Sequence, residues 1–222
     1  MRYDARMQPP LPADDRALPQ AFFSRDTRTV ARDLLGCMLV SRKDGVIAGG
    51  RIVETEAYLG ADDAGSHAAT KGITARNTVM YGPPGHLYVY FTYGAHHMLN
   101  LVCEPEGVAG AVLVRAMEPL WGVEAMERRR GGRRVHELAD GPGKLTAALG
   151  LNLGDNGVPL NVGRVFVYDA PRPAAQEVAV SGRVGLTDGH EHPYRYYLRD
   201  SRFVSRGRTG PARKARSDRR GE

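Results

Sequence analysis

Residues 37–60 read CMLVSRKDGVIAGGRIVETEAYLG, and this stretch carries the strongest fold signal in the chain. Two apolar runs of strand length, 37–41 and 46–60, flank the short polar turn Lys-Asp-Gly at 43–45. A turn of this kind between two such runs is typical of a β-hairpin. Because hairpin strands run antiparallel, we expect an antiparallel sheet in this part of the molecule.

Similar patterns recur along the rest of the chain. Further strands are expected at 86–94, 99–104, 110–118, 164–170, 177–186 and 194–200. Helices are expected at 24–36, from Pro119 to Arg130, and through 143–150 with Asp140 as the cap. The pattern contains no repeat and no internal linker. It predicts a single mixed α/β (α+β) domain with a mainly antiparallel, curved β-sheet flanked by helices.

The two ends of the chain differ in composition from this domain, which we place at residues 21–204. Residues 1–20 are rich in proline and predict a disordered leader. Residues 205–222 predict a basic, disordered tail with seven Lys or Arg and two acidic residues. Of the net charge of +6, the tail supplies +5, so the body is nearly neutral. A nucleic-acid role for the body must therefore rest on local features.

Composition excludes several classes of protein. The two cysteines, Cys37 and Cys103, are far apart and form no Cys-x-x-Cys pair, which argues against a disulfide scaffold, a zinc ribbon or an iron–sulfur cluster. No apolar run is long enough to span a membrane, and the first twenty residues lack a signal-peptide core. We expect a cytoplasmic monomer, nucleoid-associated if bacterial, with no metal, no cofactor and no membrane partner.

The segment 54–58, Glu-Thr-Glu-Ala-Tyr, is the densest candidate site. Alternation along a strand places Glu54, Glu56 and Tyr58 on one face. Two carboxylates this close repel each other unless a cation pairs with one of them or water reaches it. The motif indicates either a functional carboxylate or an edge-strand charge pair answered by nearby arginines.

A second feature is an aromatic, acid-free stretch. No Asp or Glu occurs from Ala64 to Cys103, while Lys71 and Arg76 add positive charge. Inside this stretch, a span of thirteen residues holds four of the ten tyrosines: Tyr81, Tyr88, Tyr90 and Tyr93. Such a surface suits base stacking and phosphate contact, and Tyr93, beside Gly94, is placed to project as a wedge. The alternative is that these tyrosines fill a β-sheet core.

The two features together predict a reaction. Removal of a base from deoxyribose needs a carboxylate that activates water and stabilises a cationic transition state. It also needs a stacking pocket for the extruded base and a wedge that fills the gap in the duplex. Glu56, Tyr58 and the tyrosine-rich strand supply these parts.

The chain resembles the alkyladenine (3-methyladenine) DNA glycosylase family over roughly residues 24–206. The motifs that carry the resemblance are 51–60 (RIVETEAYLG), 63–67, 76–77, 85–90, 93–94 with Asn100, 113–119 (LVRAMEP) and 141–145 (GPGKL), followed by the weaker 183–186 and 193–195. The leader and the tail lie outside it.

The resemblance implies a role for each matching residue. Glu56 would be the general base for water, Tyr58 and His67 would line one side of the base pocket, and Tyr90 would stack on the other. Tyr93 would be the intercalating wedge.

Two further roles come from the resemblance alone. Asn100 would sit against the base edge and disfavour guanine, and Arg115 would help to hold the flipped nucleotide and the water. Ala95 and His96 stand where animal members have bulkier residues, which puts the grip on the complementary strand in doubt.

The expected partner is double-stranded DNA that contains alkylated or deaminated purines. The lesions implied are 3-methyladenine and 7-methylguanine, with hypoxanthine and ethenoadenine as further candidates. The four lysines include none beside Glu56, and the chain has no amino-terminal proline. Because a Schiff-base enzyme needs an amine nucleophile in the pocket, we expect a monofunctional enzyme that leaves an abasic site.

Other interpretations stay open at this point. Residues 141–148 resemble the phosphate-binding turn of helix-hairpin-helix proteins, and Lys144 beside this helix start could contact a phosphate or simply belong to an ordinary helix. The arginines of 128–134 could also bind phosphate. A non-catalytic RNA- or DNA-binding module would use the tyrosines equally well, but not Glu54 and Glu56. A metal hydrolase is disfavoured because the histidines lack zincin spacing.

Overall fold

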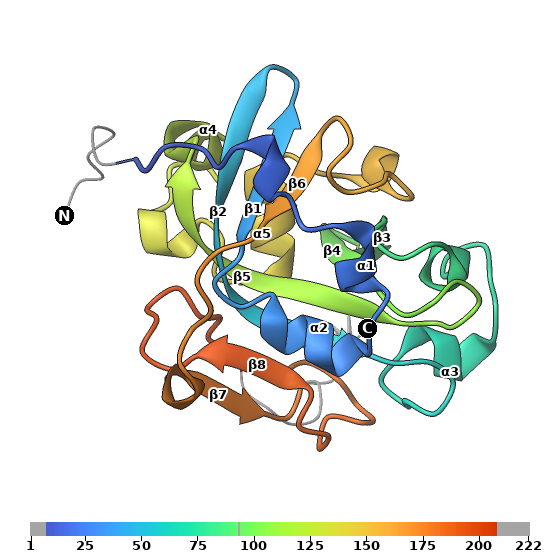
Figure 1. Cartoon of the computed structure of the whole chain (residues 1–222). Coiled ribbons are helices and arrows are strands. Elements are labelled where there is room, and N and C mark those ends of the chain that lie inside the picture. The colour runs from blue at the N-terminus through green and yellow to red at the C-terminus, as the bar shows by residue number, and fades with distance from the viewer. Residues whose placement is uncertain (1–7, 93, 208–222) are drawn as a thin grey trace, which may run out of the picture.

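The computed structural model describes residues 8–92 and 94–207, and its centre is a curled antiparallel β-sheet (Figure 1). The strands are β1 (Met38–Lys43), β2 (Val46–Tyr58), β3 (Leu87–Thr92), β4 (His96–Val102), β5 (Ala111–Trp121), β6 (Val165–Tyr168), β7 (Val178–Ser181) and β8 (Arg195–Leu198). Their order is β3-β4-β5-β2-β1-β6, with β8 pairing with both β2 and β7. All the strand pairs are antiparallel.

The predicted hairpin is confirmed as β1–β2, and β2 is the central strand. The turn between them closes at Lys43 opposite Val46, with Asp44 and Gly45 both at positive φ (54° and 72°), as a two-residue hairpin turn requires. One edge of β2 pairs with β5 along most of its length. The other edge pairs first with β1 and then, at 54–56, with β8. The carboxylate motif thus lies inside the sheet, between two neighbouring strands.

Five short α-helices surround the sheet, and the predicted mixed α/β fold is confirmed. They are α1 (Gln20–Phe23), α2 (Thr27–Asp33), α3 (His67–Lys71), α4 (Val123–Arg129) and α5 (Pro142–Leu149). Helix α2 packs against β2 and β5, and α5 packs against β4 and β5. Apolar residues of both helices join the main core.

Alternation along the strands separates a core face from a site face. On β2, the Thr55 hydroxyl donates to the Ala31 carbonyl of α2 at 2.7 Å, and Ala57 joins the core. Glu54 and Glu56 therefore point away from α2. On β3, Leu87 and Val89 belong to the core while Tyr88 and Tyr90 do not. The site is built on the face that these polar and aromatic side chains share.

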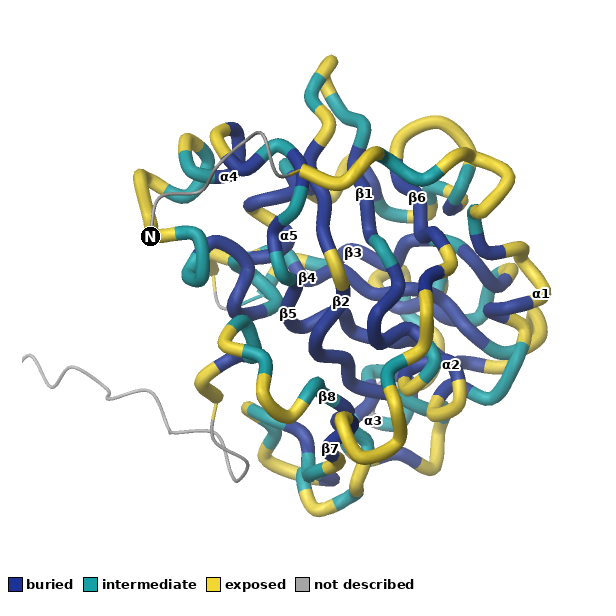
Figure 2. The backbone as a smooth tube through the Cα atoms, turned by 60° about the vertical axis from the view of Figure 1, so that its left-hand side comes forward, coloured by how far each residue is buried: buried dark blue, intermediate teal, exposed yellow. Residues whose placement is uncertain are grey.

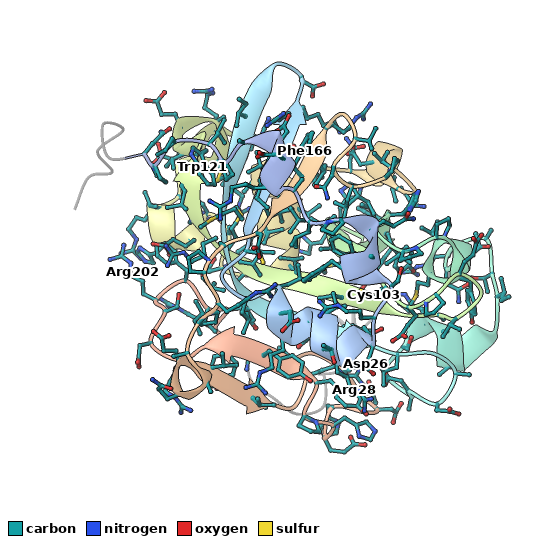
Figure 3. All side chains as sticks on the ribbon, in the orientation of Figure 1. Asp26, Arg28, Cys103, Trp121, Phe166 and Arg202 are labelled. Atoms are coloured by element: carbon teal, nitrogen blue, oxygen red, sulfur yellow. The ribbon has the colours of Figure 1, made fainter. Side chains whose placement is uncertain are left out.

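Figure 2 shows buried backbone through β1, β2 and β5, with exposure concentrated in the loops. A smaller cluster of Val40, Trp121, Phe166 and Tyr168 lies apart from the main core, and Figure 3 shows Trp121 and Phe166 near the same end of the sheet. The described residues include no helix long and apolar enough to cross a membrane.

Residues 8–20, which we placed in a disordered leader, make several contacts with the sheet. The Trp121 indole N–H donates to the Pro9 carbonyl at 2.7 Å, the Leu18 amide donates to Val167 of β6, and Asp14 pairs with Arg42. The segment has no periodicity because its only regular element before Gln20 is the short 3-10 helix Asp14–Arg16, and Ala17 then forms an isolated bridge with Tyr168 of the edge strand β6.

Two helix starts also differ from the prediction. Pro119 does not begin a helix: it lies in β5 opposite Gly50, at an irregular step of the ladder, where a residue without an N–H is tolerated. Helix α4 begins only after Gly122, whose φ of 67° ends the strand. Asp140 does not cap α5, because the cap position is Gly141 and the Asp140 carboxylate accepts from Lys144 instead.

The tail boundary moves as well. Ser205, which we placed in the tail, is buried and hydrogen-bonds to Glu54. Most of the predicted tail, residues 208–222, lies outside the described residues, as do residues 1–7.

Candidate active site

Arg115 on β5 lies between the two carboxylates of β2. Its Nε donates to Glu54 Oε1 at 2.8 Å and its Nη1 donates to Glu56 Oε2 at 3.1 Å. Thr55 pairs with Val114 and Glu54 pairs with Ala116, so Arg115 is the extra residue of a bulge in the ladder. The positive charge of Arg115 therefore offsets the repulsion between the Glu54 and Glu56 carboxylates, which the sequence motif implied.

Glu54 is fully buried and its carboxylate is saturated with donors. Oε1 accepts from Arg115, from Arg195 Nε at 2.7 Å and from the Ser205 hydroxyl at 2.9 Å, and Oε2 accepts from the Ser205 amide at 2.6 Å. Burial by itself opposes ionisation, but Arg115 and Arg195 outweigh it and hold the pKa of Glu54 below its ordinary value. Glu54 therefore acts as a structural anion that orients Arg115.

Glu56 is also fully buried, and it has a different set of partners. Oε2 accepts from the Tyr58 hydroxyl at 2.8 Å and from Arg115, while Oε1 accepts from the Val184 amide at 2.7 Å. Burial and the neighbouring Glu56 charge raise the pKa of Tyr58 well above its usual range, so its hydroxyl stays a donor. All three donors line the adjoining cavity, although Glu56 itself does not.

The cavity has a volume of about 280 Å³ and a largely aromatic wall. His67 at the start of α3 and Tyr88 and Tyr90 of β3 form that wall; His67 Nδ1 lies 3.0 Å from the Tyr88 hydroxyl and its ring lies edge-on to Tyr90, with centroids 4.7 Å apart. The rings of Tyr88 and Tyr90 are 5.2 Å apart. Burial raises the pKa of Tyr88 to about 12, which keeps this hydroxyl protonated.

The remaining walls come from segments far apart in the sequence. Asn100 of β4 is buried, donates to the Tyr88 carbonyl at 3.0 Å and lines the cavity with Met80 and Met98. Val184, Gly185 and Leu186 of the β7–β8 loop line another side of the cavity. The predicted pocket residues Tyr58, His67, Tyr90, Asn100 and Arg115 therefore all lie around one cavity.

The residues predicted to contact DNA lie in different parts of the structure. The Arg76 guanidinium lies 4.9 Å from the centre of the Tyr90 ring, at the edge of the aromatic wall. Lys144 lies on the first turn of α5, where its ammonium pairs with Asp140 at 2.9 Å. The predicted wedge, Tyr93, falls outside the described residues. These DNA-binding roles stay predictions.

In the arginine-rich segment 128–134, three side chains have structural partners. Arg129 donates to the Ala148 carbonyl, Arg130 to the Leu138 carbonyl, and Arg134 pairs with Glu137. A phosphate-binding role remains a prediction for the two other arginines of the segment, both exposed. Within the described part of the chain, no group of three or more His, Cys, Asp or Glu side chains could hold a metal ion.

Sequence reasoning missed one buried ion pair beside the site. Arg183 lies between β7 and β8 and binds Asp63, which follows β2, through both Nη atoms at 2.6 and 2.5 Å. Both residues occur in motifs that the family resemblance covers, so a signal existed. Their pairing was not visible, because about 120 residues separate them.

Known proteins are similar to this chain over most of its length. The model of a family described as methylpurine-DNA glycosylase (MPG) matches residues 21–202. A protein of Carboxydothermus hydrogenoformans named "Putative 3-methyladenine DNA glycosylase" is 46% identical over 85% of this chain and 98% of its own length. A protein of Methanoculleus marisnigri with the same name is 49% identical to this chain over 85% of the chain and 98% of its own length. Another, from Chlorobium luteolum, is 48% identical over 86% of this chain and 97% of its own length.

Proposed function

This chain belongs to the methylpurine-DNA glycosylase family, and we propose that it releases alkylated purines from duplex DNA with Glu56 as the general base for water. The family consists of DNA glycosylases, which hydrolyse N-glycosyl bonds. The observation that carries the proposal is the buried Glu56 carboxylate, held by three donors that themselves line an aromatic cavity.

The hydrogen bonds of Glu56 indicate where the water would bind. Each oxygen of an ionised carboxylate can accept about two hydrogen bonds. Oε2 already accepts from Tyr58 and Arg115, whereas Oε1 accepts from the Val184 amide alone among the described residues. A water on Oε1 would lie beside Val184, which lines the cavity. Glu56 would take its proton as the water oxygen bonds to the sugar carbon and the base departs.

The cavity wall supports binding of an extruded base. A base cannot be reached inside the duplex, so an enzyme of this kind must rotate the nucleotide out of the stack. The rings of Tyr58, His67 and Tyr90 all line the cavity, where they offer surfaces on which an extruded base could stack. Asn100 lies at the wall with its side-chain amide held by Tyr88, where it would contact a base edge and disfavour guanine.

The substrate range is tested with single-lesion duplexes. Cationic lesions such as 3-methyladenine and 7-methylguanine leave readily, so Glu56 and base flipping suffice for them. We expect release of these bases at rates well above those for hypoxanthine or ethenoadenine, for which no general acid is evident. Quantifying the free base by chromatography measures each rate. An enzyme that released no base from any of these duplexes would refute the proposal.

We further expect hydrolysis without strand cleavage. Lys43 and Lys144 are paired with Asp155 and Asp140, and neither lines the cavity. We propose water as the nucleophile, so the product strand should break only after alkali treatment. Incubation with lesion duplex and borohydride should trap no covalent protein–DNA adduct. A trapped adduct would show that an amine attacks the sugar.

A further inference from the structure

Arg183 is a fully buried cation whose two Nη atoms make four hydrogen bonds, while its buried Nε has no hydrogen-bond partner among the described residues. Its Nη1 donates to Asp63 and to the Ala57 carbonyl at 2.9 Å, and its Nη2 donates to Asp63 and to the Gly189 carbonyl at 2.8 Å. Asp63 in turn accepts from the amides of its own loop. The ion pair therefore ties the loop after β2 to the β7–β8 loop.

The guanidinium leaves little room for a side chain at two neighbouring glycines. A Cβ on Gly65 would lie 2.6 Å from Arg183 Nη2, and a Cβ on Gly189, which has a φ of 68°, would lie 2.9 Å from the same atom. Two glycines from different loops thus accommodate one guanidinium. The site is built around Arg183 and does not merely tolerate it.

Arg183 is linked to both oxygens of Glu56 through its neighbours. Val184, the next residue, donates its amide to Oε1 at 2.7 Å. The Arg183 guanidinium also lies 4.7 Å from the centre of the Tyr58 ring, whose hydroxyl donates to Oε2. The Ala57 carbonyl that Arg183 holds lies between Glu56 and Tyr58 in the chain.

We propose that Arg183, oriented by Asp63, is a positioning residue that sets the Val184 amide and the Tyr58 hydroxyl on the carboxylate of Glu56. The inference rests on the proposed role of Glu56 as the base. A carboxylate that activates water must be held within a fraction of an ångström, because small misplacements slow reactions strongly. Arg183 would touch neither base nor sugar and would act only through these two donors.

The first test is Asp63→Asn, which keeps the shape of the side chain and removes its charge. We expect the single-turnover rate of 3-methyladenine release to fall about 10- to 100-fold, while the Kd for the lesion duplex stays within about threefold. Arg183→Lys should show the same split, because one ammonium cannot bind both carboxylate oxygens and both carbonyls. If Kd rises as much as the rate falls, the pair only shapes the pocket and the proposal is wrong.

The matched control is Asp155→Asn. Asp155 is equally buried, accepts from the Asn152 amide and pairs with Lys43 at 2.7 Å and Arg164 at 3.0 Å, away from the cavity. It should lower Tm comparably and leave the rate unchanged. Equal rate losses in the two variants would mean that stability alone explains the effect.

A sharper variant replaces the Val184 amide by an ester, through incorporation of the corresponding hydroxy acid. This removes one N–H and leaves every side chain in place, so it does not depend on whether an Arg183 variant folds. We expect a rate loss similar to that of Asp63→Asn. Full activity of the ester enzyme would overturn the positioning role. If Glu56→Gln also kept full activity, the proposed role of Glu56 as the base would fail as well, so the two failures are distinguishable.

Discussion

Glu56→Gln is expected to lower the single-turnover rate of base release by about 10²- to 10⁴-fold, the usual contribution of a general base. The variant keeps the size of the side chain and removes the charge that would take a proton from water. Because the cavity wall formed by His67 and Tyr90 is unchanged, binding of a 3-methyladenine duplex should persist. Rate and Kd are measured on the same duplex, by free-base chromatography and by fluorescence anisotropy.

The control concerns the hydrogen bonds of the substituted residue. Glu56 accepts from three donors, so the glutamine NH₂ must face at least one N–H or O–H. A loss of Tm is therefore expected, and rates are compared at a temperature where both proteins are folded. A non-catalytic DNA-binding module makes a different prediction, since its wild-type form would bind the duplex and release no base. Unchanged release by Glu56→Gln would remove Glu56 from the reaction.

The sheet was predictable because its signals are local. The hairpin of 38–58 follows from two apolar runs around a turn, and its long second strand became the centre of the sheet. Errors arose where a non-local contact decided the structure. Pro119 resembles a helix start, but it lies in β5 opposite Gly50, where a Cβ would clash with the Glu118 carbonyl. Residues 8–20 lack periodicity, yet partners more than a hundred residues away hold them.

In the candidate site, too, local signals placed some residues and only the family resemblance placed others. Alternation alone placed Glu54 with Glu56, and Tyr88 with Tyr90, and the structure has each pair on a shared face. The gathering of His67, Asn100 and Arg115 around one cavity was expected only from the family resemblance, because they come from three separate elements. Their catalytic and binding roles stay predictions.

Several contributors to the site were given no role from the sequence, and Ser205 and Arg183 are two of them. Ser205 was assigned to a basic tail on composition, whereas its amide and hydroxyl both bind Glu54. Arg183 followed a short strand with nothing local to mark it as a buried cation. Each is defined by a partner more than a hundred residues away, and no pattern of spacing encodes such a pairing.

Arg115→Met is expected to be the most destabilising single change at the site. Arg115 is buried, and it donates to both Glu54 and Glu56. Methionine fills similar space but removes the ion-pair partner of Glu56 and leaves Glu54 with Arg195 alone. Breaking a buried pair in this way typically costs about 3–5 kcal/mol. For a chain of this size, that corresponds to a fall in Tm of roughly 10 °C, measurable by calorimetry.

The matched control for this change is Arg28→Met. Arg28 pairs with Asp26 at 2.8 Å at the start of α2, where both side chains are largely exposed (Figure 3). Because exposed pairs contribute little, this substitution should change Tm far less. A similar fall in both variants would show that loss of any arginine, rather than of the buried cation, destabilises the protein.

The pH dependence of the Tm difference between wild type and Arg115→Met identifies the cause of the lost stability. Burial opposes ionisation of Glu54, but Arg115 and Arg195 prevail and hold its folded pKa below the ordinary value of 4.5. The ionised carboxylate therefore stabilises the wild-type fold above pH 4.5, and this contribution disappears as the pH falls through the folded pKa. Arg115→Met lacks much of it, so the difference in Tm between the two proteins should be largest near pH 7 and shrink below about pH 4. A difference that stayed constant from pH 7 to pH 3 would mean that lost packing, and not the lost charge, accounts for the destabilisation.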